Sequence, residues 1–279
     1  MVSEDMTWVC LAAGQGTRLR PITDDRPKAM VPVAGRPLLD WLTGTARSVG
    51  IDNLAVVTGY KNEVIEKHVE SDVATYHNPE YASTDMVRSL WCARDVLEGP
   101  VVLSYSDILY TPEVLQSVVK SPHDIAVAVD NQWQSYWERR HENPIEDAES
   151  LRLEADDRIA SIGQDVDSIS APEAQYIGLV KLSARGVKSL REAYQKAVNS
   201  TSTDQNPFGS QRSFENIHMT DLLQGIIDNG VPVHAEQINA GWVEIDTPRD
   251  LEIAESVCHP DTGSTLKIDR KEAGNGTKE

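Results

Sequence analysis

Two glycines and two basic residues follow the first apolar stretch of the chain, in an arrangement that could bind a triphosphate. Gly14 and Gly16 let the backbone turn so that successive amides face an anion. The guanidinium of Arg18 could bind the β and γ phosphates, and Lys28 offers a mobile charge for the α phosphate. A tight turn alone would also explain two glycines this close together, so the loop by itself leaves both interpretations open.

Two aspartates end apolar stretches farther along the chain and could hold a metal ion. Asp107 follows VVLSYS, and Asp246 follows WVEI just before a Thr-Pro helix start. Parallel sheets place ligand-binding groups at the carboxyl ends of their strands, and Mg²⁺ takes one or two carboxylates together with phosphates and water. A strand-end turn at Asp107 and a helix cap at Asp246 are the alternatives. Glu244 lies on the same strand face as Asp246 and could support such a metal site.

The overall charge bounds the class of partner. The formal net charge is −18, which argues against nucleic acid because a phosphate backbone needs a basic face. Residues 14–36 nevertheless carry five basic side chains against two acidic ones, so positive charge gathers around the glycine-rich loop. No stretch approaches the roughly 20 apolar residues of a membrane span, and the acidic start is unlike a signal peptide. We therefore expect a cytoplasmic protein without a membrane partner.

The elements that would position these residues alternate between strands and helices, which predicts an α/β fold with a doubly wound, mostly parallel sheet, Rossmann-like. Residues 1–257 are expected to form one domain with an inserted lobe at about 130–218, and residues 258–279 are polar and aperiodic and are expected to be disordered. Strands are predicted at 7–12, 54–58, 73–77, 101–104, 125–129, 151–154, 158–162, 175–182, 233–238 and 242–245, and helices at 38–49, 61–70, 84–97, 111–119, 184–198, 219–229 and 248–258.

Three strings in the first forty residues resemble one superfamily. Residues 14–21 (GQGTRLRP), 26–33 (RPKAMVPV) and 35–39 (GRPLL) are similar to the sugar-nucleotidyltransferase and cytidylyltransferase superfamily. The resemblance extends to about residue 257. It implies that Arg18 and Lys28 contact the triphosphate and that Asp107 and Asp246 bind Mg²⁺, making these four the catalytic residues. The nucleotide-binding residues are then expected to be Leu11, Ala12, Ala13, Gly14, Gln15, Gly16, Thr17, Arg18, Lys28, Thr84, Ser89 and Ser104.

Further strings resemble two smaller groups within that superfamily. Residues 57–60 and 78–81 are similar to bacterial choline-phosphate cytidylyltransferases. A closer resemblance is to the phosphonate cytidylyltransferases of phosphonate natural-product pathways, in residues 84–90, 104–108, 143–151, 175–179 and 241–246. It implies transfer of CMP from CTP to 2-aminoethylphosphonate, 2-hydroxyethylphosphonate or phosphonoformate. Phosphocholine or a sugar 1-phosphate is the alternative acceptor, and a non-catalytic nucleotide sensor of the same fold is a third interpretation. The chain could form a homodimer.

Such a reaction needs neither a nucleophilic side chain nor a general base. The phosphate or phosphonate oxygen of the acceptor is already ionised at neutral pH. Catalysis then consists of in-line positioning and charge neutralisation at the α phosphorus.

The acceptor site is less well determined by the sequence. Asp85 stands where the phosphonate group usually has Asn, and Gln164 stands where sugar-phosphate members have a lysine. Because arginines outnumber acids in residues 131–141, an anionic or neutral phosphonate is favoured over an aminoalkyl one. The alternative is that this segment forms a surface helix with one aromatic stripe packed on the core. The expected acceptor-binding residues are Arg139, Arg140, Lys181, Tyr176, Gly178 and Glu244.

Overall fold

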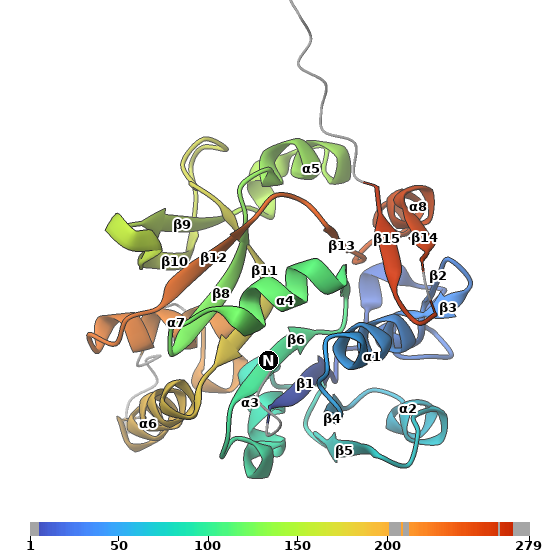
Figure 1. Ribbon diagram of the computed structural model, residues 1–279, viewed down its shortest axis with the longest axis horizontal. Coiled ribbons are helices and arrows are strands. Elements are labelled where there is room, and N and C mark those ends of the chain that lie inside the picture. The colour runs from blue at the N-terminus through green and yellow to red at the C-terminus, as the bar shows by residue number, and fades with distance from the viewer. Residues whose placement is uncertain (1–5, 201–207, 209–211, 262, 270–279) are drawn as a thin grey trace, which may run out of the picture.

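The computed structural model describes residues 6–200, 208, 212–261 and 263–269, which fold around one seven-stranded sheet (Figure 1). The strand order is β12-β8-β11-β6-β1-β4-β5, and only β11 runs antiparallel to its neighbours. The prediction of a mostly parallel sheet is confirmed. The strands are β1 (Thr7–Ala12), β4 (Asn53–Thr58), β5 (Val73–His77), β6 (Val101–Tyr105), β8 (Ile125–Asp130), β11 (Gln175–Leu182) and β12 (His234–Ile238).

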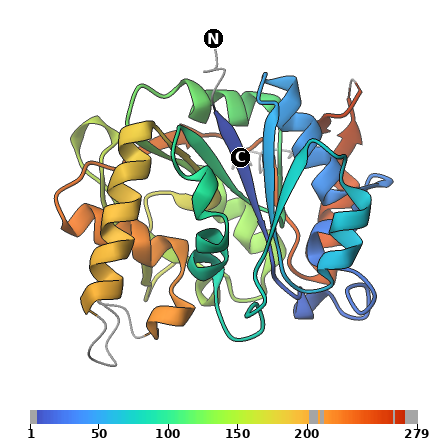
Figure 2. The ribbon, with the colours of Figure 1, turned by 90° about the horizontal axis from the view of Figure 1, so that it is seen from below.

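Helices cover both faces of this sheet, so its central strands are buried on both sides (Figure 2). Along β1, Trp8 and Cys10 belong to one apolar cluster, and Val9 and Leu11 belong to the other. The first cluster includes side chains from α1, α2, α4, α5 and α8, and the second includes side chains from α3, α6 and α7. The helices are α1 (Leu38–Ser48), α2 (Asn62–His68), α3 (Met86–Cys92), α4 (Pro112–Lys120), α5 (Trp133–Arg140), α6 (Ala184–Ser200), α7 (Met219–Asp228) and α8 (Pro248–Val257).

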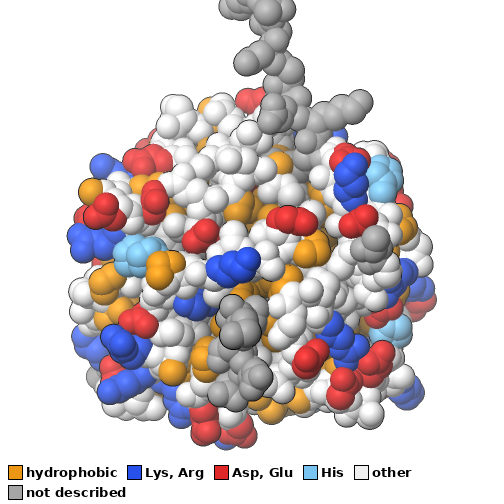
Figure 3. All heavy atoms as spheres, viewed as in Figure 1, with side chains coloured by type: hydrophobic (Ala, Val, Ile, Leu, Met, Phe, Trp, Pro, Cys, Tyr) orange, Lys and Arg blue, Asp and Glu red, His pale blue; other side chains and the backbone are white. Residues whose placement is uncertain are grey.

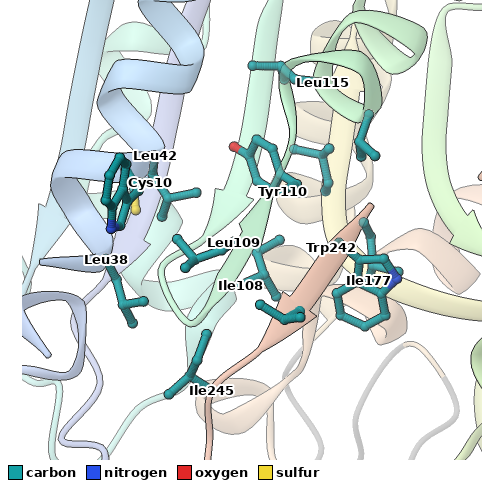
Figure 4. Packing of buried hydrophobic residues seen from close by; sticks show 14 of the residues in the cluster. Cys10, Leu38, Leu42, Ile108, Leu109, Tyr110, Leu115, Ile177, Trp242 and Ile245 are labelled. Carbon is teal, nitrogen blue, oxygen red and sulfur yellow. The ribbon is translucent and has the colours of Figure 1, made fainter. Parts of the chain in front are cut away.

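The first cluster ties the sheet to the segment that carries Asp107 (Figure 4). Leu38 and Leu42 of α1 lie beside Cys10 of β1, and Leu109 fills the space next to them. Trp242 is fully buried farther along the same cluster. Its indole nitrogen donates to Asp130 Oδ2 at 2.8 Å, so this large side chain is fixed in orientation as well as in depth.

A short antiparallel pair brings the two aspartates together. β7 (Ile108–Tyr110) pairs with β13 (Trp242–Glu244), so that the residue before one strand lies beside the residues after the other. The amide of Ile245 donates to the carbonyl of Asp107 at 2.7 Å, which extends the pairing past the end of β13. Asp107 and Asp246 are 139 positions apart in the sequence, and this backbone pairing places them next to each other.

The inserted segment is smaller than the sequence predicts. Residues 130–218 were expected to form one lobe, but β11 lies between β8 and β6 in the main sheet, and α6 packs on that sheet. What lies outside the sheet between β8 and β11 is α5 with the antiparallel pair β9 (Glu149–Leu153) and β10 (Ile159–Asp165). The sequence offered a helix for this segment only as the alternative to an acceptor-binding segment, and α5 agrees with that alternative.

The segment after α8 is not disordered as far as the structure describes it. β14 (Cys258–Pro260) pairs with β15 (Leu266–Ile268), and Leu266 and Ile268 are buried in the first cluster. The turn between them lies against α1 so closely that a Cβ on Gly44 would stand 2.3 Å from the carbonyl oxygen of Ser264. The expectation of disorder is therefore wrong for this hairpin, and residues 270–279 lie outside the described residues.

Two further features complete the described fold. A small pair, β2 (Pro32–Val33) with β3 (Arg36–Pro37), leads into α1. In the part of the chain that the structure describes, no helix has the length and apolar character that crossing a membrane requires.

Candidate active site

A cleft of about 260 Å³ opens at the carboxyl end of β1, where the glycine-rich loop begins. The loop can reach this conformation because Gly16 has a φ of +61°, and a Cβ there would stand 3.0 Å from the Cβ of Lys28. Thr23 donates to the carbonyl of Gly16 at 2.7 Å and fixes the turn. The cleft is lined by Leu11, Ala13, Gly14, Gly16, Thr17, Arg18, Lys28, Tyr81, Thr84, Asp85, Met86, Ser89, Tyr105, Ser106, Asp107 and Asp246.

The four residues expected to be catalytic meet at the floor of this cleft. The ammonium of Lys28 donates to Asp107 Oδ2 at 2.8 Å and to Asp246 Oδ1. Arg18 forms an ion pair with the other oxygen of Asp246. Lys28 is 8% exposed, whereas the side chain of Arg18 is 60% exposed, so the lysine is held inside and the arginine reaches outward. Two cations and two carboxylates therefore neutralise one another where a triphosphate would lie.

The chemistry of the two aspartates is compatible with a metal ion as well as with Lys28. Asp107 Oδ1 is buried and has no hydrogen-bond partner among the described residues. Buried polar atoms are normally satisfied, so a carboxylate oxygen without a partner, on an aspartate that shares Lys28 with a second aspartate, suits a hard cation such as Mg²⁺. The donor set at this point consists of carboxylates alone, which leaves the other coordination positions to phosphates and water.

A second cavity, of about 230 Å³, shares a wall with the first. Arg18, Asp107 and Asp246 line both cavities, so the floor of the nucleotide cleft is also the entrance to the second one. The lining is strongly acidic. It consists of Arg18, Met86, Tyr105, Asp107, Ile108, Trp137, Asp147, Glu149, Gln175, Tyr176, Ile177, Gly178, His218, Thr220, Glu244 and Asp246.

Burial shifts two of the acids in this second cavity. It raises the pKa of Glu149, an effect that His218 and Arg212 partly offset. It also raises the pKa of Glu244, although Arg140 acts in the opposite direction. The positive φ of Gly178 (+86°) brings its backbone against the ring of Tyr105, where a side chain would collide at 2.6 Å. The cavity is lined by three of the expected acceptor-binding residues: Tyr176, Gly178 and Glu244.

The three expected cationic acceptor ligands lie elsewhere, which corrects the sequence prediction. Arg140 is buried, and it donates to Asp250 Oδ1 at 2.8 Å and to Glu244 Oε2 at 2.5 Å. Arg139 is exposed and lines neither cavity. Lys181 donates to the carbonyls of Ser121 and His123 at 3.1 and 2.7 Å, away from the site. The alternative interpretation of the aromatic segment describes it better: its aromatic side chains, Trp133, Tyr136 and Trp137, are buried in the core.

Three expected nucleotide ligands also do not line the cleft. Ser104 is fully buried, where its hydroxyl donates to the carbonyl of Tyr105 and accepts from Tyr110. Ala12 points into the core, and Gln15 is not among the lining residues. Thr84 and Ser89 do line the cleft, and both accept hydrogen bonds from the amide of Asn78, at 3.1 and 2.9 Å.

Asp85, which departs from the usual residue, is paired with a histidine. Asp85 Oδ2 lies 3.3 Å from His218 Nε2, while Oδ1 accepts from the amide of Met86 at the start of α3. The bond between the two residues raises the pKa of His218 and lowers that of Asp85, against the effect of burial. The sequence offered no means of finding His218, because it lies 133 positions from Asp85 and outside every recognised string.

A glycine-rich loop after a parallel strand, with a lysine, an arginine and two aspartates meeting at its base, defines a nucleotidyltransferase. The chain belongs to the MobA-like NTP transferase domain family, whose model matches residues 8–200. Over 256 residues it is 33% identical to the CTP:phosphoglutamine cytidylyltransferase of Campylobacter jejuni, which covers 89% of this chain and 98% of that protein.

Other relatives act on related acceptors. The chain is 34% identical over 125 residues to the CMP-5'-(3-aminopropyl)phosphonate synthase of Streptomyces rubellomurinus, covering 43% of this chain and 20% of that protein. The solved structure of CTP:phosphocholine cytidylyltransferase from Streptococcus pneumoniae matches with a TM-score of 0.70 at 21% identity, over 90% of this chain and 98% of that one. The resemblance to cytidylyltransferases found in the sequence is thus confirmed at the level of family and fold.

Proposed function

We propose that this nucleotidyltransferase transfers CMP from CTP to a small acceptor through a phosphonate or phosphate oxygen, releasing pyrophosphate. The observation that carries the proposal is the shared floor of the two cavities, where Arg18, Asp107 and Asp246 line both. An acceptor in the second cavity would meet the α phosphorus of a nucleotide in the first at that point. Four relatives are named for CMP or cytidylyl transfer, which supports CTP as the donor, whereas another is named as a UTP--glucose-1-phosphate uridylyltransferase, so UTP is the alternative donor.

The residues at the shared floor would act by position and charge. The amides of the glycine-rich loop and the guanidinium of Arg18 bind the β and γ phosphates, and Lys28 offsets the charge that grows on the α phosphate in the transition state. Asp107 and Asp246 would hold Mg²⁺, which supplies Lewis-acid activation of the phosphoryl group. The acceptor oxygen is ionised at neutral pH, so no side chain has to remove a proton from it.

The charge of the second cavity favours an acceptor that carries an amine. Asp147 and Glu149 line it beyond the two metal-binding candidates, Glu244 is already paired with Arg140 behind the wall, and neither Arg139 nor Arg140 lines the cavity. An ammonium group would be stabilised among these carboxylates, whereas the carboxylate of phosphonoformate would be repelled. We therefore propose an amino-bearing phosphonate, such as 2-aminoethylphosphonate, as the acceptor.

A phosphorylated amino compound is the second candidate. The relative from Campylobacter jejuni matches this chain over nearly its whole length and is named for phosphoglutamine, which also combines a phosphoryl group with an ammonium group. The acidic cavity suits the ammonium group of both acceptors, but phosphoglutamine also carries a carboxylate, which the acidic lining would repel. The test must therefore include both.

Pyrophosphate release tests the proposal directly. CTP, UTP, ATP and GTP are each combined with 2-aminoethylphosphonate, 2-hydroxyethylphosphonate, phosphonoformate, phosphoglutamine, phosphocholine and glucose 1-phosphate. We expect turnover with CTP and an amino-bearing acceptor, and none in excess EDTA or with Asp107→Ala. Preference for phosphonoformate would contradict the amine assignment, and full activity in EDTA would contradict the metal assignment. No turnover with any pair would remove the proposed function.

Partners and location follow from the same proposal. The net charge of −18 supports small-molecule partners rather than nucleic acid. Because CTP and Mg²⁺ are available in the cytoplasm, we propose that the protein acts there. The homodimer stays a prediction, which sedimentation or light scattering would test.

A further inference from the structure

The second cavity has too few cations for an acceptor that brings about two negative charges on its phosphonate. Five carboxylates line it, and Arg18 and His218 are its basic residues among those that the structure describes. Arg18 is shared with the nucleotide cleft and is paired with Asp246. His218 is thus the basic side chain that belongs to this cavity alone.

His218 is held in place from two helix starts. Its ring contacts Asp85, which caps α3 through the amide of Met86 at 2.8 Å, and its own amide donates to Asp221 Oδ2 in the first turn of α7 at 2.7 Å. The amide of Asp85 also donates to the carbonyl of Glu215, which joins the two chain segments a second time. These contacts fix the position of His218 relative to the starts of α3 and α7.

The charged groups around the ring favour its cationic form. Asp85 from the start of α3 and Glu149 from β9 both raise the pKa of His218, whereas burial and Arg212 lower it. Arg212 is itself within 3.3 Å of Asp221, which offsets part of its charge. The net shift is upward, so the imidazolium is more populated than in a free histidine.

The position of the pair matches the place where the acceptor must react. Asp85 lines the nucleotide cleft, His218 lines the second cavity, and Met86 lines both. The pair therefore lies on the wall between the cavities. Met86 belongs to the boundary between the cavities together with Arg18, Asp107 and Asp246, so an acceptor in the second cavity that attacks an α phosphorus in the first would lie close to this pair.

We propose that His218 binds the phosphonate or phosphate oxyanion of the acceptor and that Asp85 is the residue that positions it. This inference rests on the proposed function and adds an acceptor ligand to it. It also explains the aspartate at position 85: an anion there would repel a triphosphate unless a cation faced it, and His218 does so.

Steady-state kinetics with His218→Gln tests this assignment, using CTP and the best acceptor of the panel. Loss of one charge-assisted hydrogen bond should raise KM for the acceptor about 10- to 100-fold and leave KM for CTP within about twofold. The control is His68→Gln, because His68 is also paired with an aspartate, at 2.6 Å from Asp40, but lines neither cavity. The control should match the wild type in both constants.

The pH dependence separates binding from a structural role. The cationic form exists below the raised pKa and is lost above it, so the ratio of wild-type to His218→Gln kcat/KM for the acceptor should fall as pH rises. Taking the ratio removes the ionisation of the acceptor itself. Asp85→Asn removes the partner that raises this pKa, and it should move the fall to lower pH.

Several outcomes would overturn the assignment. These are unchanged acceptor KM in His218→Gln, an equal change in both KM values, or a ratio that does not vary with pH. If the wild type itself shows no turnover with any acceptor, the proposed function fails first, and that result is distinct from a variant that matches an active wild type.

Discussion

Lys28 is the side chain on which the active site depends most directly. It is buried, yet its ammonium contacts both aspartates of the floor. If its charge mainly serves the transition state, Lys28→Ala should lower kcat by about 10²- to 10³-fold, the range found when one preorganised donor is removed. The KM for CTP should change less. A variant altered only in KM would instead identify Lys28 as a ground-state ligand.

Single residues were predictable where the backbone itself determines their position. Gly16, Arg18 and Lys28 belong to one loop and the turn packed against it, so the local sequence constrains them together. Long cations are different, because each can direct its charged end to several places. Arg140 pairs with Asp250 of α8 and Glu244 of β13, and Lys181 donates to the backbone carbonyl of Ser121. These partners come from distant parts of the chain, so the sequence alone could not identify them.

Helix α5 is attached to the rest of the fold through Arg140. Its guanidinium stacks near Trp137 and neutralises Asp250 and Glu244, both of which lie on other elements. Removing one partner of a buried ion pair leaves charge uncompensated, so Arg140→Ala should lower the free energy of unfolding by about 3–5 kcal/mol.

The neighbouring arginine provides the matched control for that experiment. Arg139 is exposed, so Arg139→Ala should change the free energy of unfolding by no more than about 0.5 kcal/mol. Urea denaturation of both variants measures the difference. Equal stabilities would mean that Arg140 does not anchor α5.

The hairpin after α8 makes a prediction of the same kind. Leu266 is 2% exposed within the first apolar cluster, and Lys267 beside it points outward. Leu266→Ala should cost about 2–5 kcal/mol, the range for truncating a buried leucine. Lys267→Ala should have little effect. If the leucine variant is as stable as the lysine variant in thermal melts, the hairpin does not contribute to the fold.

Elements were predicted well wherever their periodicity was strong, as in β1, β5 and β11, whose ranges agree with the structure. The order of strands in the sheet was not predictable, because β11 enters between β6 and β8 from a distant part of the chain. The hairpin was missed because its strands are three residues each, too short for an alternating pattern to stand out among polar neighbours.

The whole molecule carries 44 acidic side chains against 26 basic ones. Figure 3 shows both signs interspersed on the face it views. Exposed ion pairs contribute about 0–1 kcal/mol each, so the dominant electrostatic effect should be repulsion among the excess acids. Because salt screens that repulsion, Tm should rise as NaCl increases from low to moderate concentration. A Tm that falls with salt would show that the ion pairs outweigh the net charge.

The ion pairs at the floor of the cleft have a consequence for the order in which ligands bind. Lys28 and Arg18 already neutralise Asp107 and Asp246, so a metal ion arriving alone must compete with an internal counterion. A triphosphate offers those cations a replacement partner and frees the carboxylates at the same moment. Donor and metal should then enter as one cooperative exchange. Calorimetry should accordingly find weak Mg²⁺ binding to the free protein and much tighter binding once CTP is present.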